Sequence, residues 1–264
     1  MATVTSQDGT EIAFSRSGSG PALILVDGAL CSRGFGPARA LAARLTDWFT
    51  VYIYDRRGRG ESGDTGPYSV AREIDDLDAL IKEAGGSAFV CGVSSGAVLA
   101  LEAANALPSI TRLALCEAPF VVDDTGTPIP SDFVSRLRGY VESGHRGAAV
   151  NAFMKLVGTP AIFRGLMRVT PVWSKLKAVA HTLPYDITIM NVHPSGTSLS
   201  ATRWTSVTAP VLVMDGGKSP QWMRNTTREL AAVVPGARHR TLEGQTHMVK
   251  PDVLAPQLVS FFTE

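Results

Sequence analysis

The stretch Phe89-Val-Cys-Gly-Val-Ser-Ser-Gly-Ala97 decides how this chain is expected to fold. It matches the pattern G-x-S-x-G, with Gly92, Ser94 and Gly96 in the fixed positions. An apolar run leads into the pattern and an alanine-rich run leads out of it. This order predicts a strand that turns sharply into a helix and exposes the central serine at the turn. Small residues flank the serine because larger side chains would collide in such a strained bend.

Apolar runs and amphipathic segments alternate through most of the chain. Runs that are apolar on both faces predict central strands of a parallel sheet, and they fall at residues 22–26, 50–54, 88–93, 113–116 and 211–214, with a weaker run at 237–242. Helical patterns separate them, at residues 37–45, 70–84, 95–107, 221–234 and 251–262. A hairpin around Asp8-Gly9 comes first. The alternation predicts an α/β fold with a doubly wound, mostly parallel sheet.

One region interrupts this alternation. Residues 120–206 contain four helical patterns, no convincing strand, and prolines that separate the patterns. We expect a helical cap here, inserted after the sixth strand, over a core formed by residues 1–119 and 207–264. Most bulky apolar residues of the cap are expected to pack it onto the core, and a few to line a cleft: Phe153, Met154, Leu156, Ile162, Phe163, Leu166, Met167 and Trp173.

The composition is that of an ordinary globular protein. Of the 264 residues, 45% are hydrophobic and 19% charged, and the net charge is +1. This balance gives no reason to expect nucleic acid or a membrane surface as a partner, so we expect a small-molecule substrate and a monomer or homodimer. The first twenty residues lack the apolar segment of a secretory signal, which predicts a cytoplasmic protein.

No metal and no cofactor are expected. The three cysteines, Cys31, Cys91 and Cys116, lack the spacing of metal ligands, and two of them fall inside predicted strands, as buried packing residues do. No glycine-rich phosphate loop follows the first strands. The loop at residues 55–63 combines an aspartate, three arginines and glycines, and we expect it to be structural, with its charges tying it to neighbouring elements.

The serine at the turn requires a base, because a free hydroxyl is a poor nucleophile. His247 follows the last predicted strand and precedes the last helix, which fits the chain order serine, acid, histidine. The backbone N–H of Ser95, directly after Ser94, is expected to bind an oxyanion. The four remaining histidines are less well placed and are expected to be structural or solvated: His145, His181, His193 and His239.

These segments together resemble the α/β-hydrolase superfamily over nearly the whole chain apart from the cap. The segments that carry the resemblance are residues 25–28, 54–63, 89–97, 210–216 and 242–247. The chain looks like a member of a bacterial subgroup of serine-nucleophile hydrolases of esterase or lactonase type, for which no settled substrate can be inferred, and the motifs specify none. By position, the resemblance implies that the N–H of Ala29 is the second oxyanion donor, whatever its side chain.

Two positions depart from the family's pattern. Asp27 stands where the family often has histidine, and its charge would lie close to a forming oxyanion. Ser219 stands where family members commonly carry the catalytic aspartate, and a serine cannot stabilise an imidazolium as a carboxylate does.

The acid must therefore come from elsewhere, if the chain uses one. Haloalkane dehalogenases and some other members take it from the end of the sixth strand, where this chain has Glu117. Glu117 is our first candidate and Asp215 the alternative. A structural alternative for Glu117 is an ion pair with an arginine of residues 56–59.

The residues and the resemblance favour hydrolysis of a carboxylic ester or lactone with a small to medium, largely apolar substrate. Ser94 would attack the carbonyl and form an acyl-enzyme while His247 takes its proton. Asp27 and the displaced acid keep a second hypothesis open, a cofactor-free lyase, C–C hydrolase, acyltransferase or perhydrolase on the same fold. A third hypothesis is a non-catalytic ligand receptor.

Overall fold

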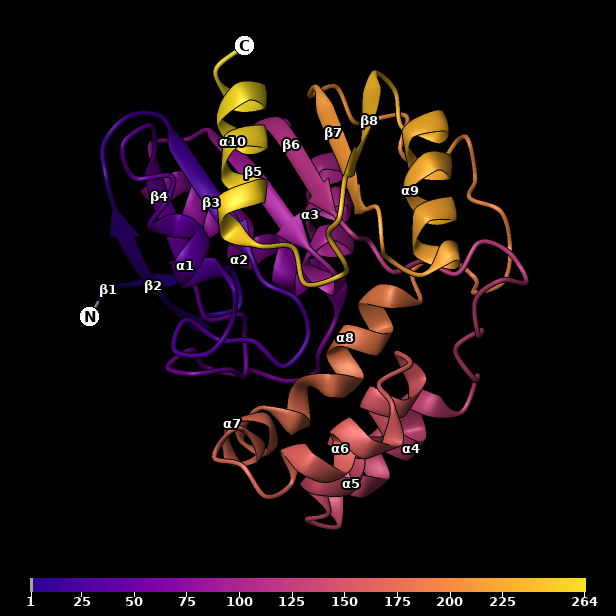
Figure 1. Cartoon of the computed structure of the whole chain (residues 1–264). Helices are drawn as coiled ribbons and strands as arrows, with labels where there is room; N and C mark the ends of the chain where they lie inside the picture. The colour runs from indigo at the N-terminus through magenta and orange to yellow at the C-terminus, as the bar shows by residue number, and fades with distance from the viewer. Residues whose placement is uncertain (1) are drawn as a thin grey trace.

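The computed structural model describes residues 2–264, and one eight-stranded sheet runs through it (Figure 1). The strands are β1 (Ala2–Thr5), β2 (Glu11–Ser17), β3 (Ala22–Val26), β4 (Thr50–Tyr54), β5 (Ala88–Val93), β6 (Ile110–Cys116), β7 (Val211–Gly216) and β8 (Ala237–Leu242). Their order across the sheet is β1-β2-β4-β3-β5-β6-β7-β8. β2 runs antiparallel to both of its neighbours, and the other pairs are parallel. The predicted α/β fold with a mostly parallel sheet is confirmed.

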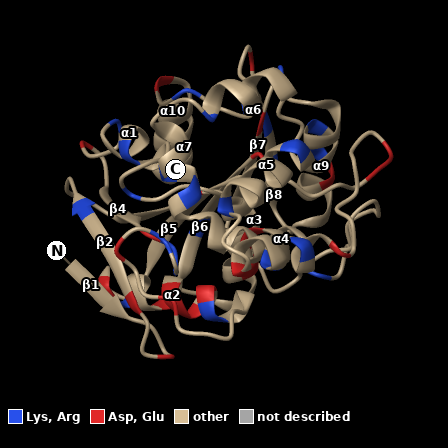
Figure 2. Ribbon diagram, turned by 90° about the horizontal axis from the view of Figure 1, so that it is seen from below, with Lys and Arg blue, Asp and Glu red and all other residues tan. Residues whose placement is uncertain are grey.

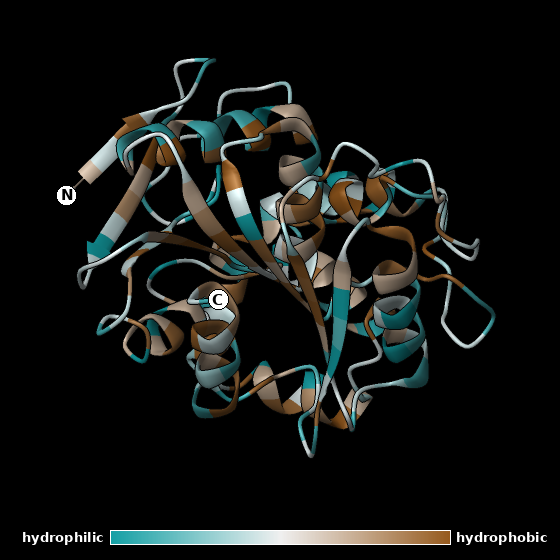
Figure 3. Cartoon of the chain, turned by 90° about the horizontal axis from the view of Figure 1, so that it is seen from above, coloured by the Kyte–Doolittle hydropathy of each residue, from teal (hydrophilic) through white to brown (hydrophobic). Residues whose placement is uncertain are grey.

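Helices cover both faces of the sheet, and the apolar strands, brown in Figure 3, lie between them. One face carries α2 (Val70–Glu83), α3 (Ser95–Ala106) and α9 (Gln221–Val233), and the other carries α1 (Ala38–Ala42) and α10 (Pro251–Phe262). The longest of them, α2, has 14 residues. Within residues 2–264, no helix has both the length and the apolar character needed to cross a membrane.

Nine of the twelve residues of the central helix α3 are buried, and its position explains why. It packs against β5 and β6 and is covered in turn by α2 and α8 (Leu183–Met190). A helix covered on most sides needs little polar surface, and its many alanines allow close approach to the strands. The N-terminus of α3 is therefore held firmly at the carboxyl edge of the sheet.

The remaining helices lie between β6 and β7 in the chain and gather on one side of the sheet in Figure 1. They are α4 (Phe133–Glu142), α5 (Arg146–Leu156), α6 (Ala161–Met167), α7 (Val172–Ala178) and α8, with a 3-10 turn at Ala180–Thr182. They share an apolar cluster that also includes Leu30 from the loop after β3. We call residues 120–206 the helical insertion; its division from the core stays a prediction.

Two details of the insertion differ from expectation. The sequence predicted four of its helices but not α8, whose β-branched Ile187, Thr188 and Ile189 are weak helix formers. Most of the bulky apolar residues were expected to pack the insertion onto the core, yet α6 has no buried residue. Ile162 and Phe163 in that helix are 73% and 58% exposed.

Candidate active site

Ser94 stands at the turn between β5 and α3 with φ 56° and ψ −129°. Residues other than glycine rarely adopt a positive φ, so the turn is strained. Side chains in place of its glycines would collide: a Cβ atom on Gly96 would meet the carbonyl oxygen of Val26, and one on Gly92 would meet that of Gly96. The strand, sharp turn and helix that the motif predicts are all present.

Glu117 occupies a matching bend at the end of the next strand, β6. Its φ is also 56°, and its N–H donates to the carbonyl oxygen of Met214 at 2.9 Å. The N–H of Ser94 donates to the carbonyl oxygen of Cys116, also at 2.9 Å. Two adjacent strands therefore end in equivalent bends, one carrying a hydroxyl and the other a carboxyl group.

The Glu117 side chain is fully buried and surrounded by hydrogen-bond donors. One carboxylate oxygen accepts the N–H of Gly216 and, at 2.6 Å, the hydroxyl of Ser219. The other lies 3.2 Å from Nδ1 of His247. Burial by itself raises the pKa of Glu117, but the bonds from His247, Ser219 and Gly216 outweigh it and lower the pKa. Glu117 is thus held as a carboxylate beside the histidine.

The structure separates the two candidate acids. Asp215 is as deeply buried as Glu117, yet its Oδ2 lies 3.4 Å from Nε2 of a different histidine, His239 of β8. Ser219, the serine at the family's usual acid position, donates its hydroxyl to Glu117. The hydrogen-bond partner of His247 is therefore Glu117 and not Asp215.

A cavity of about 350 Å³ lies at this edge of the sheet, and both Ser94 and His247 line it. Most of the wall is apolar, including Leu41, Val93, Phe153, Met190, Trp222 and Leu254. Within residues 2–264, no hydrogen bond joins Ser94 to His247. The structure therefore brings nucleophile and base candidates into one apolar cavity without a direct contact between them.

The two predicted oxyanion donors lie beside the turn that carries Ser94. Ala29 lines the cavity and follows Gly28, where an added Cβ atom would lie 2.9 Å from that of Ser94. Ser95 begins α3, so its N–H has no acceptor within the helix. In the part of the chain that the structure describes, neither N–H donates to another backbone carbonyl. Both N–H groups therefore lack a backbone acceptor among the described residues, and their role as oxyanion donors stays a prediction.

Comparison with known proteins agrees with this geometry. A sequence model described as the alpha/beta hydrolase family matches residues 22–257. The chain belongs to this family. A crystal structure of an alpha/beta hydrolase from Sphaerobacter thermophilus is 52% identical, with 99% of this chain and 100% of that chain covered and a TM-score of 0.91.

More distant hydrolases share parts of the sequence or the fold alone. The pimeloyl-[acyl-carrier protein] methyl ester esterase of Stenotrophomonas maltophilia is 32% identical over 150 residues, which are 50% of this chain and 55% of that protein. The chain thus spans about half the length of the curated relatives it matches. The enol-lactonase of Burkholderia xenovorans has the same fold, with 22% identity, full coverage of both chains and a TM-score of 0.73.

Asp27 of this hydrolase lies in the cavity wall and is 7% exposed. Burial raises its pKa to about 7, and the positive charges of Arg59 and Arg56 hold it from rising further. A carboxyl group with this pKa is neutral in part of the molecules near pH 7. The charge that the sequence placed close to a forming oxyanion is correspondingly reduced.

The hydrolase's three cysteines also line the cavity and are free. Cys91 and Cys116 are buried in strands as expected, whereas Cys31 is half-buried in the loop after β3. Burial raises the pKa of Cys31 and of Cys91 to about 12, so both are neutral thiols. Within residues 2–264, no three histidine, cysteine, aspartate or glutamate side chains are grouped so that they could hold a metal ion.

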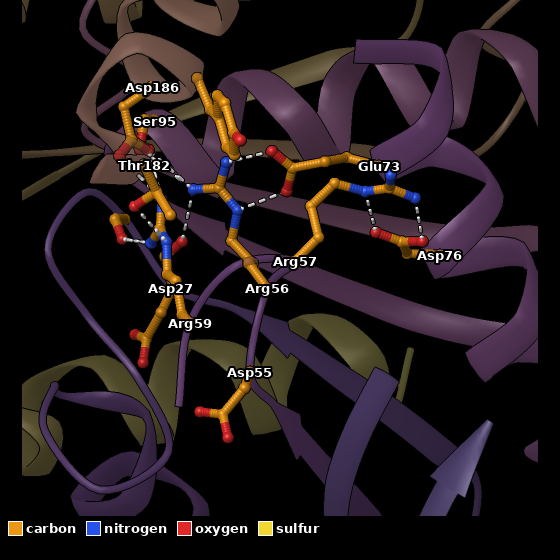
Figure 4. Close-up of polar contacts among 12 residues, drawn as sticks. Asp27, Asp55, Arg56, Arg57, Arg59, Glu73, Asp76, Ser95, Thr182 and Asp186 are labelled. Carbon is orange, nitrogen blue, oxygen red and sulfur yellow. Dashed lines mark hydrogen bonds and ion pairs between the residues drawn. The ribbon is translucent and has the colours of Figure 1, made fainter. Parts of the chain in front are cut away.

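The arginine-rich loop after β4 is buried and paired with acids. Arg56, Arg57 and Arg59 are each no more than 2% exposed, and their principal partners are Glu73 and Asp76 of α2, an acidic helix marked red in Figure 2, and Asp186 of α8 (Figure 4). The suggested ion pair between one of these arginines and Glu117 does not occur among the described residues. Sequence reasoning did not single out Asp186, an isolated acid in an otherwise apolar helix.

Proposed function

We propose that this hydrolase cleaves carboxylic esters or lactones of small to medium, largely apolar substrates through an acyl-enzyme. The observation that carries the proposal is the shared cavity of Ser94, at a strained turn, and His247, bonded to the buried carboxylate of Glu117. The esterase and the enol-lactonase among the similar proteins support this class of reaction.

In the proposed reaction, Ser94 Oγ attacks the substrate carbonyl and passes its proton to Nε2 of His247. Nδ1 of the ring faces Glu117, so the carboxylate stabilises the imidazolium that forms. The N–H groups of Ala29 and Ser95 bind the oxyanion. His247 then protonates the leaving alcohol, and a water molecule activated by the same ring hydrolyses the acyl-enzyme.

The base must approach the nucleophile for this to happen. His247 has a side chain that is 34% exposed and lies in the loop between β8 and α10, so it has room to turn. Catalytic hydrogen bonds are often long before substrate binds and tighten in the complex. We therefore assign the Ser94–His247 contact to the substrate-bound state.

The cavity favours uncharged acyl groups. Its size falls in the lower part of the range of ligand pockets, about 300–1,000 Å³. Among residues 2–264, Asp27 is the one carboxyl group in its wall. We expect butyryl and hexanoyl nitrophenyl esters to be cleaved with kcat/KM at least about tenfold above succinyl esters, because an anionic acyl group would be desolvated beside Asp27. Steady-state kinetics on such a panel measure this preference, and faster cleavage of the succinyl esters would contradict it.

The direct test replaces the nucleophile. Ser94→Ala should lower kcat for a nitrophenyl ester by about a thousandfold or more, because a nucleophile, its base and its acid act together in catalysis. Its melting temperature serves as the folding control. Full activity in a folded Ser94→Ala variant would reject the mechanism, and failure of the wild-type protein to react with a fluorophosphonate would favour a ligand receptor.

Asp27 favours a second candidate, a cofactor-free reaction in which a cavity carboxyl group moves a proton. A group with a pKa of about 7 can both give and take a proton at neutral pH. Assays with β-diketones, thioesters and peroxide distinguish this candidate. If Asp27 moves the proton in such a reaction, Asp27→Asn should abolish that activity. Simple ester hydrolysis should survive the same substitution.

A further inference from the structure

Both proposed oxyanion donors are tied to one buried carboxylate of the helical insertion. Ala29 follows β3 and Ser95 begins α3, so they come from separate parts of the core. Asp186 of α8 pairs with Arg59 and accepts a hydrogen bond from Ser95, as Figure 4 shows. Arg59 in turn donates to the peptide that carries the N–H of Ala29. No step of the proposed reaction uses Asp186 or Arg59.

Arg59 fixes the peptide that carries the first donor. Its guanidinium donates to the carbonyl oxygen of Gly28 at 2.7 Å. The peptide unit is planar and trans, so that oxygen and the N–H of Ala29 point in opposite directions. Holding the oxygen therefore fixes the direction of the N–H. A charged donor on the oxygen also polarises the amide, which makes the N–H of Ala29 a stronger donor.

Asp186 anchors the residue that carries the second donor. The hydroxyl of Ser95 donates to Oδ1 of Asp186 at 2.8 Å. Arg56 donates to the same oxygen at 2.9 Å and contacts the Ser95 hydroxyl at 3.4 Å. Both carboxylate oxygens of Asp186 accept from Arg59, at 2.8 and 2.7 Å. The charges of Arg59 and Arg56 lower the pKa of Asp186 against the effect of its complete burial, so it stays ionised.

Stability alone is a weak reason for this arrangement. Arg56, Arg59 and Asp186 are all at most 2% exposed, and removing charges from water is strongly unfavourable even when they are paired. The same loop contains a comparison that lacks the oxyanion contacts. Arg57 makes a two-pronged pair with Asp76 at 2.8 and 2.7 Å, equally buried, but donates to neither Gly28 nor Ser95.

We propose that Arg59 and Asp186 are positioning residues that hold the Gly28–Ala29 peptide and Ser95 in the geometry that binds an oxyanion. The inference rests on the proposed ester or lactone hydrolysis. It makes the helical insertion a part of the catalytic apparatus, because α8 supplies the carboxylate that both donors depend on.

The test uses Arg59→Lys, with Arg57→Lys as the matched control. Lysine keeps the charge but cannot reproduce the planar fork that contacts Gly28 and Asp186 together. Removing an oxyanion donor costs roughly a hundredfold to a thousandfold in kcat, so misplacing one should cost about tenfold to a hundredfold, with KM changed less than about threefold. Arg57→Lys should lower the melting temperature comparably and leave kcat within about threefold.

A second readout follows the oxyanion itself. A trifluoromethyl ketone forms a tetrahedral adduct with Ser94, and its inhibition constant should rise in Arg59→Lys by the same factor as kcat/KM falls. Ser95→Ala keeps the backbone N–H, leaves Asp186 paired with both arginines, and should lower kcat by about tenfold. This milder variant keeps the test decisive if Arg59→Lys fails to fold.

The positioning role is overturned if the folded variants of Arg59 and Ser95 match Arg57→Lys in kcat and in ketone inhibition. It is also overturned if they change KM alone. Failure of the proposed ester or lactone hydrolysis would give a different result. The wild-type protein would then fail to bind the ketone, or Ser94→Ala would retain full activity.

Discussion

The ends of β6 and β7 present nearly the same residue in nearly the same place, with different surroundings. Glu117 and Asp215 are both fully buried, and each lies near a histidine, at 3.2 and 3.4 Å. Three groups donate to Glu117, and its partner His247 lines the cavity. Asp215 keeps a buried Oδ1 without a hydrogen bond among the described residues. The neighbours of a carboxylate, more than its burial, decide what it can do.

The largest expected effect comes from removing the negative charge of Glu117. Glu117→Gln should lower kcat by about a thousandfold to ten-thousandfold, because an amide of the same shape does not stabilise the imidazolium of His247. Asp215→Asn, the matched change on the next strand, should leave kcat within about threefold. Steady-state kinetics on both folded variants measure the difference, and a larger loss in Asp215→Asn would reverse the assignment of the acid.

A smaller effect comes from moving the carboxylate. Ser219 Oγ lies 2.6 Å from the Glu117 carboxylate, so an aspartate at position 219 would place its charge near His247. Adding Ser219→Asp to Glu117→Gln should restore kcat by about tenfold, since a charge at a displaced position recovers part of the interaction. The comparison of the single and double variants gives this factor. No recovery in a folded double variant would mean that position 219 does not serve His247.

A third carboxyl group, Asp27 directly after β3, differs from Glu117 in how it affects stability. Its pKa is raised to about 7, so between about pH 4 and 7 the unfolded chain ionises while the folded carboxyl group stays neutral. The stability that this group contributes is present below pH 4 and is lost as the pH rises to about 7. Relative to Asp27→Asn, the wild-type melting temperature should therefore fall by roughly 5–10 °C across this window.

Thermal unfolding of both proteins at several pH values measures that difference. Glu117 has a lowered pKa and acts in the opposite sense, with stability present above its unfolded pKa and lost as the pH falls through the folded value. A difference between wild type and Asp27→Asn that does not change between pH 4 and 7 would show that Asp27 is ionised throughout.

The sequence predicted the fold well because the signals for it are local. Each parallel strand is a short apolar run, and the elbow around Ser94 needs a few small residues next to each other. The pairing of the acids could not be resolved in this way. His247 and Glu117 are 130 positions apart, and the distinction from Asp215 depends on which histidine each carboxylate meets in the folded chain.

Asp186 was not identified from the sequence, for a similar reason. Its contact with Ser95 spans 91 positions, and α8 contains β-branched residues that weaken the helical pattern. The loop at residues 55–63 was expected to tie down its neighbours, and it does so through its arginines. No local sequence pattern identified Asp186 as the partner of Arg59. The link from the helical insertion to Gly28 and Ser95 was therefore not predicted.

A crystal structure of the protein after reaction with an alkyl phosphonate will show whether Ser94 reacts next to the two backbone donors. We expect phosphorus bonded to Ser94 Oγ, with the phosphoryl oxygen within hydrogen-bond distance of the N–H groups of Ala29 and Ser95. We also expect His247 to lie beside the leaving-group position and still to contact Glu117. An adduct on another residue, or a phosphoryl oxygen turned away from both amides, would mean that the proposed mechanism is wrong.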